Sequence, residues 1–116
     1  MKLTTELEKR IDRWVDEHIE RLAEDTCKLI RIESVSDKTS DVKPFGQGCR
    51  DALAKYIELG EAYGLKAHNY ENYVAKLFVP ENRGKAKQIG LMGHLDVVPA
   101  GENWIYPPYK IGRAHV

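Results

Sequence analysis

The stretch QIGLMGHLDVVPAG, Gln88–Gly101, decides how this chain is expected to fold. Its first part is apolar almost without a break, which is typical of a strand buried on both faces in a parallel or mixed sheet covered by helices. We therefore predict a strand over residues 88–98. Two chemically active side chains, His94 and Asp96, lie near its end.

The pair of His94 and Asp96 has the spacing of a metal ligand and its orienting partner. Residues i and i+2 of a strand share one face, and open α/β sheets place ligand crevices at the C-terminal ends of their strands. Neutral imidazole is a good ligand for zinc, and a carboxylate can accept the other ring N–H and fix the tautomer. The alternative is a plain structural hydrogen bond between the two side chains at the end of the strand. The pattern by itself is weak evidence for a metal site, because His-x-Asp occurs by chance in roughly one chain in seven of this length.

Upstream, residues 5–31 show the period of an amphipathic helix. Thr5 and Glu8 fit a capping box at its start, and we expect His18, beside the apolar stripe, to be a partly exposed helix residue rather than a ligand. The stripe consists of Leu7, Ile11, Trp14, Val15, Ile19, Leu22, Leu29 and Ile30.

Residues 33–48, ESVSDKTSDVKPFGQG, are rich in Ser, Asp, Thr, Gly and Pro and predict a loop. A loop this long is either functional or a mobile surface segment, and both readings stay open. A second helix is predicted over 48–63, with Gly64 placed for a left-handed C-cap.

Two short strand-like runs then flank Glu71-Asn72, which predicts a hairpin. His68 in the first run is expected to face solvent. The predicted order is two helices and then three strands, which makes a layered α/β unit. Two helices cover only one face of such a sheet, so the other face is expected to need further elements.

Composition describes one ordinary soluble globular domain, with 42% hydrophobic and 31% charged residues. Eighteen basic and eighteen acidic residues cancel, so we expect neither a nucleic acid nor an anionic membrane as partner. The charged N-terminal stretch predicts no signal peptide, and no apolar run is long enough for a membrane span. Cys27 and Cys49 are expected as free thiols in a reducing cytoplasm.

The stretch GHLDVVPAGENWIYPPY, residues 93–109, resembles the signature of the M20 family of metallopeptidases. In that signature an apolar strand runs into H-x-D-V-V-P-A-G, followed by a Trp, two prolines and an aromatic residue. IRIESVSD, residues 30–37, and the stretch 44–77 resemble the first-helix ending, second helix and hairpin of its dipeptidase (PepV-like) branch. The resemblance covers about Leu3 to Tyr109 and implies that 1–110 is the N-terminal part of a zinc-peptidase-like catalytic domain.

The resemblance implies a dinuclear hydrolase that cleaves short peptides with metal-activated water, using two Zn²⁺ ions or else Mn²⁺ or Co²⁺. His94 matches a metal ligand, and Asp96 matches the catalytic aspartate that orients this histidine. Pro99, Ala100, Gly101 and Trp104 match the loop beside the site, where packing explains them as well as substrate contact. The family's bridging aspartate, its general base and its other ligands belong to later motifs that do not occur in this sequence.

Residues 111–116, IGRAHV, do not resemble the family. They match the translation of ATC GGA AGA GCA CAC GTC, the start of a common sequencing adaptor. We therefore expect an adaptor-derived tail without packing contacts, in which His115 has no function. The leading interpretation is an N-terminal fragment of a dipeptidase that is inactive alone. The alternative is a non-catalytic small α/β binding or interaction module; the oligomeric state and the dipeptide cleaved stay open.

Overall fold

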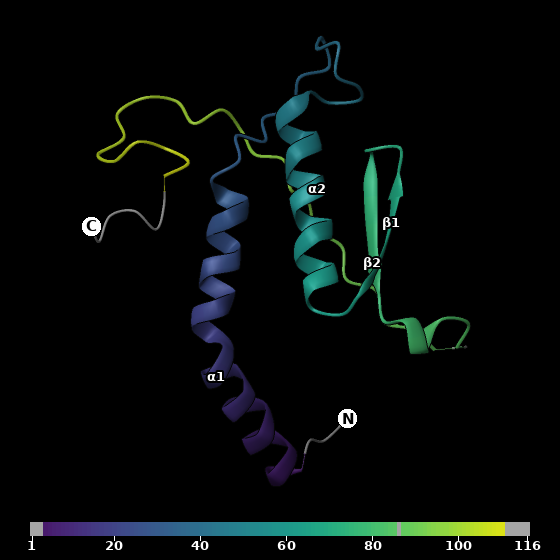
Figure 1. Cartoon of the computed structure of the whole chain (residues 1–116). Helices are drawn as coiled ribbons and strands as arrows, with labels where there is room; N and C mark the ends of the chain where they lie inside the picture. Colours follow the sequence, from purple (N-terminus) through teal and green to yellow (C-terminus); the bar gives the residue numbers. More distant parts are fainter. Residues whose placement is uncertain (1–3, 86, 111–116) are drawn as a thin grey trace.

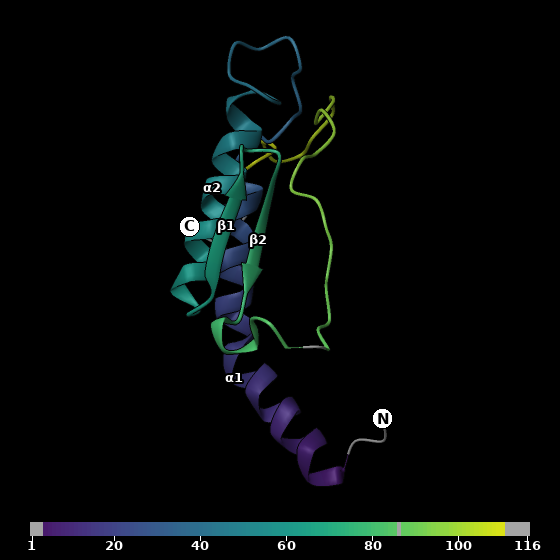
Figure 2. The ribbon, with the colours of Figure 1, turned by 90° about the vertical axis from the view of Figure 1, so that its right-hand side faces the viewer.

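The computed structural model describes residues 4–85 and 87–110. Within them α2 lies between α1 on one side and a two-stranded hairpin on the other (Figures 1 and 2). The chain order is α1 (Thr5–Ile30), α2 (Gln47–Ala62), β1 (Lys66–Tyr70), β2 (Val74–Phe78) and a short 3-10 helix, η1 (Pro80–Asn82).

Helix α1 confirms the predicted first helix but begins with a different cap. Thr4 has an extended backbone, and its hydroxyl accepts a hydrogen bond from the amide of Leu7 at 3.3 Å. The capping box predicted from Thr5 is therefore wrong, because Thr5 is already helical. The apolar stripe of α1 remains largely in solvent, with Trp14 56% exposed, and the N-terminal half of the helix extends away from the rest of the molecule (Figure 2).

His18 is a partly exposed helix residue, as predicted. Its ring stacks on Trp14 with 4.1 Å between the centroids. Its Nδ1 lies 2.7 Å from the carbonyl oxygen of Trp14. These two contacts within α1 explain the orientation of the His18 ring.

A buried carboxylate joins α1 to the end of α2. Asp25, 8% exposed, accepts hydrogen bonds from Lys28 Nζ and from the Tyr63 hydroxyl, both at 2.7 Å. The guanidinium of Arg21 lies over the Tyr63 ring at 4.3 Å. Hydrogen bonds from Lys28 and Tyr63 hold the pKa of Asp25 below its usual range, because they favour the charged carboxylate.

Helix α2 packs closely against the hairpin and contributes the buried apolar residues of the described chain, Ala52 and Leu53. A Cβ at Gly60 would lie 2.3 Å from Cδ1 of Leu77, so glycine allows the helix to approach β2. Gly64 follows the helix with φ of +83°, which confirms the predicted left-handed C-cap.

The hairpin between β1 and β2 is also confirmed. Its strands pair antiparallel, from Lys66 opposite Phe78 to Tyr70 opposite Val74. Glu71 and Asn72 both have positive φ, as a type I′ turn requires. His68 is exposed on β1, as expected, and packs edge-on against Tyr70.

The predicted third strand is wrong. Residues 88–98 run extended beside β2 without joining it (Figure 2), and their one bridge is a parallel pairing of Val97 with Val35. A strand is defined by the ladder of hydrogen bonds that it forms with a neighbouring strand. No described strand pairs with the backbone of this segment at Ile89, Leu91 or Met92. The described chain is thus an α/β unit with two helices and a two-stranded antiparallel sheet, not three strands.

The loop predicted over 33–48 contains no strand or helix before Gln47. It is hydrogen-bonded internally, since Asp37 accepts from both the amide and the hydroxyl of Thr39. Within the described chain no helix has the length and apolar character needed to cross a membrane. The adaptor-derived tail predicted for 111–116, with His115, lies outside the described residues.

Candidate functional site

His94 and Asp96 are hydrogen-bonded to each other. The Nδ1 atom of His94 lies 3.1 Å from Oδ1 of Asp96 and 2.9 Å from its carbonyl oxygen. A carbonyl oxygen can only accept, so Nδ1 carries the hydrogen and Nε2 of the neutral ring keeps its lone pair. The His94 side chain is 82% exposed, which leaves Nε2 open to a ligand.

The pair does not lie where the sequence placed it, at the end of a central strand. It lies at the end of the extended, unpaired segment 88–98. The contact between the two side chains therefore depends on local geometry and on what holds the backbone around Asp96.

Ser34, in the α1–α2 connection, holds that backbone. Its hydroxyl donates to the carbonyl of Leu95 at 2.7 Å, and its own carbonyl accepts from the amide of Val97 at 3.1 Å. Ser34 is 2% exposed, so both bonds are shielded from water. Sequence reasoning did not single out Ser34, although it lies in the 30–37 stretch that carried part of the family resemblance.

The start of α2 packs directly against Ser34. A Cβ on Gly48 would lie 2.0 Å from the Glu33 carbonyl oxygen and 3.3 Å from the Ser34 Cα atom, so only glycine fits there without a shift. The Cys49 thiol donates to the Ser34 carbonyl at 3.4 Å. Burial, and to a smaller degree the charge of Asp96, raises the pKa of Cys49, which keeps this thiol protonated and a poor nucleophile. Cys49 and Cys27 are both free.

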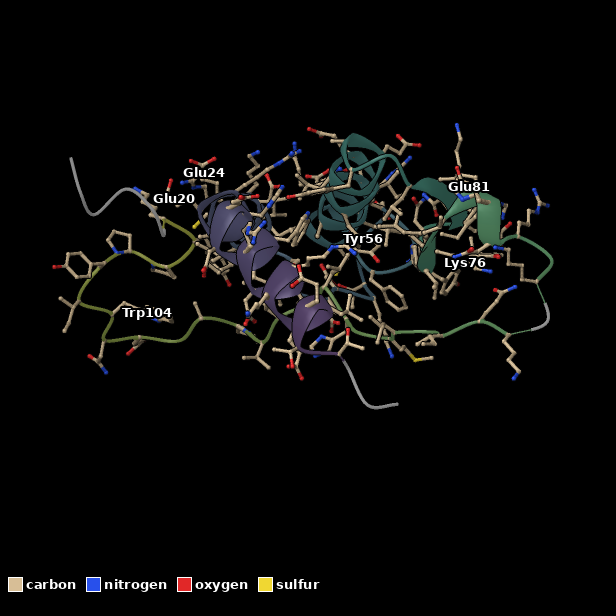
Figure 3. All side chains as sticks on the ribbon, turned by 90° about the horizontal axis from the view of Figure 1, so that it is seen from below. Glu20, Glu24, Tyr56, Lys76, Glu81 and Trp104 are labelled. Atoms are coloured by element: carbon tan, nitrogen blue, oxygen red, sulfur yellow. The ribbon has the colours of Figure 1, made fainter. Side chains whose placement is uncertain are left out.

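A hollow of about 1860 Å³ separates the extended segment from the hairpin and α2. Cys49, Leu53 and Tyr56 of α2 line one side, and His94 and Asp96 are among the residues on the opposite side. Tyr56 lies on α2 above this segment in Figure 3. The hollow gives the pair an accessible, partly apolar surrounding.

Trp104 lies well away from the helices, on the last described stretch of chain (Figure 3). Its indole N–H donates to the carbonyl of Ala100 at 2.7 Å, and the side chain is 58% exposed. In the described chain Trp104 thus stabilises its own loop.

The described residues do not form a complete metal centre. Residues 4–85 and 87–110 contain no group of three or more His, Cys, Asp or Glu side chains arranged to hold a metal ion. Zinc usually has three or four protein ligands, whereas the pair offers one free nitrogen, Nε2 of His94.

Comparison with known proteins indicates the relationship of the chain. It is 34% identical over 93 residues to the Beta-Ala-Xaa dipeptidase of Lactobacillus delbrueckii subsp. lactis. It is 36% identical over 93 residues to the putative dipeptidase YtjP of Bacillus subtilis (strain 168). Each match covers 78% of this chain. The chain is related to dipeptidases.

A third dipeptidase relative, the putative dipeptidase SH1171 of Staphylococcus haemolyticus (strain JCSC1435), is 34% identical over 99 residues, 83% of this chain. The matches confirm the resemblance to dipeptidases. The dipeptidase-related chain covers 19–20% of the length of these three relatives. No family model matches the sequence.

Proposed function

We propose that this chain is part of a metal-dependent dipeptidase of the M20 type, with His94 as one metal ligand and Asp96 as the residue that orients it. One observation carries the proposal. In a chain related to dipeptidases, the His94 ring donates Nδ1–H to Asp96 and keeps Nε2 free. A metal-bound histidine usually has this arrangement with a carboxylate or carbonyl partner.

The complete enzyme would hold two Zn²⁺ ions, or Mn²⁺ or Co²⁺ in their place, and these ions would supply activated water for cleavage of short peptides. The residues of this chain would present and orient a ligand. The remaining ligands and the general base would come from parts of the longer protein outside this sequence. The proposal includes the division into 1–110, from the catalytic domain, and 111–116, from an adaptor.

The physiological partner would be a small peptide substrate and not a nucleic acid or a membrane. The charges of the chain cancel, which leaves no excess of basic residues for an anionic polymer. Two free thiols fit a reducing compartment, so we place the enzyme in the cytoplasm.

Genomic DNA beyond codon 110 tests the proposal. We expect the reading frame to continue and to encode Asp-Asp-Lys-Gly, followed by further acidic and histidine motifs. A genuine stop at that point would instead favour a non-catalytic α/β binding or interaction module.

A second test uses the purified 116-residue chain with dipeptides and excess zinc or manganese. We expect no released amino acids, because one ligand does not make a catalytic metal site. Turnover that disappears in His94→Ala would contradict the idea that the site needs residues from a longer protein.

A further inference from the structure

Ser34 forms hydrogen bonds to both residues that flank Asp96. Its hydroxyl donates to the carbonyl of Leu95, and its carbonyl accepts from the amide of Val97. Both bonds join the described stretch 87–110 to the α1–α2 connection. In Figure 1 the extended segment crosses the α1–α2 connection at this place.

The two bonds fix the peptide units on either side of Asp96. The direction of the Asp96 carboxylate and the place of its carbonyl oxygen depend on this short piece of backbone. Both oxygens contact Nδ1 of His94. A shift of the backbone at Leu95 or Val97 would therefore turn the His94 ring and move its free Nε2.

Ser34 is itself held firmly. Its amide donates to the carbonyl of Ile32 at 2.9 Å, and its carbonyl also accepts from the Cys49 thiol. The close approach of Gly48 to Glu33 brings the connection against the first turn of α2. A rigid support of this kind is what a ligand-presenting segment needs when its own strand pairing is missing.

We propose that Ser34 is a positioning residue for the His94–Asp96 pair. Its hydroxyl fixes Leu95, its carbonyl fixes Val97, and together they set the direction in which His94 presents Nε2. The proposal rests on the proposed function for its consequence in catalysis, whereas its structural part stands on the hydrogen bonds alone.

Hydrogen exchange with millisecond labelling, read by mass spectrometry on the full chain at low micromolar concentration, tests the structural part. Ser34→Ala removes the hydroxyl, and we expect peptides covering Leu95 to Val98 to exchange about five- to tenfold faster, as the loss of one hydrogen bond predicts. Peptides from α2 should be unchanged. Ser36→Ala is the matched control, since Ser36 is exposed and its side chain makes no hydrogen bond within the described chain.

Unchanged exchange at 95–98 in folded Ser34→Ala would overturn the proposal. If Ser34→Ala does not fold, Ser34→Cys replaces the hydroxyl with a weaker donor of similar size. Folded Ser34→Cys should then exchange about threefold faster or more at 95–98, and exchange at the wild-type rate would overturn the proposal.

Kinetics of the longer protein test the consequence for catalysis. Ser34→Ala should lower kcat about tenfold or more and leave KM nearly unchanged, and Ser34→Thr, which keeps the hydroxyl, should recover most of kcat. An equal loss in both variants would argue against positioning through the hydroxyl. If the longer wild-type protein does not hydrolyse dipeptides, the proposed function fails while the exchange result still decides the role of Ser34.

Discussion

The phenol oxygen of Tyr63, at the end of α2, lies 2.7 Å from Oδ2 of Asp25 in α1. This bond links the two helices through a carboxylate that also accepts from Lys28. A buried polar group of this kind is costly when one partner is removed, since its remaining oxygen is left without a donor. The stability of the helix pair should therefore depend on the Tyr63 hydroxyl.

Tyr63→Phe should lower the urea midpoint of unfolding by roughly 0.5 M, the effect of one lost hydrogen bond in a small domain. Far-UV circular dichroism at low micromolar concentration measures it. Tyr106→Phe is the control, because Tyr106 is 70% exposed and should leave the midpoint in place. Equal midpoints for Tyr63→Phe and wild type would contradict a stabilising role for this bond.

Stability should also depend on pH through Asp25. The hydrogen bonds from Lys28 and then Tyr63 lower its pKa in the folded chain. A carboxyl with a depressed folded pKa stabilises the fold above its unfolded pKa, and this contribution is lost as pH falls through the folded value. We expect urea midpoints of wild type and Asp25→Asn to differ most near neutral pH and to converge below about pH 4. A difference that stays constant down to low pH would show that the carboxylate charge plays no part.

Gly48→Ala should destabilise the chain by about 1–3 kcal/mol, a typical cost of overpacking. The added methyl would meet a backbone oxygen of Glu33, which cannot move like the end of a side chain. The clash should exceed the gain of about 1 kcal/mol in helix propensity. Gly90→Ala is the matched control, with nothing within 4 Å of its Cβ, and should change the unfolding free energy by less than about 0.5 kcal/mol. A Gly48→Ala protein as stable as this control would exclude the close approach.

The extended segment should make the isolated chain associate. Ile89, Leu91 and Met92 are 95–102% exposed, and contiguous exposed apolar side chains favour association. Size-exclusion chromatography in the absence of urea should show species larger than a monomer, and Leu91→Ser with Met92→Ser should reduce them. A clean monomer with a sharp cooperative thermal transition would contradict this and would favour a self-sufficient binding module.

The parts of the fold that depend on local sequence were predictable. Both helices and the hairpin appear within a residue or two of the predicted bounds, because the 3.6-residue period, Gly64 and the Glu71-Asn72 turn act over short distances. The sequence predicts Thr5 as the N-cap of α1, whereas the structure has Thr4 in that position. Either of two adjacent threonines can supply the capping hydroxyl, so the local sequence does not distinguish them.

The third strand could not be predicted from its own residues. The apolar run around Leu91 has the composition of a buried strand, but pairing requires a neighbour that the described residues do not supply. The same limit applies to the site. The spacing of His94 and Asp96 pointed to their contact, whereas the support by Ser34 is a long-range relationship with no local pattern to reveal it.

Dipeptide hydrolysis by the protein encoded by the extended reading frame tests most directly whether His94 and Asp96 belong to a metallopeptidase site. We expect the wild-type protein with zinc or manganese to release amino acids. Asp96→Ala should lower the rate about 10–100-fold, and His94→Ala should lower it further. A His94→Ala protein that hydrolyses dipeptides at the wild-type rate would show that His94 is not a ligand of the catalytic metal.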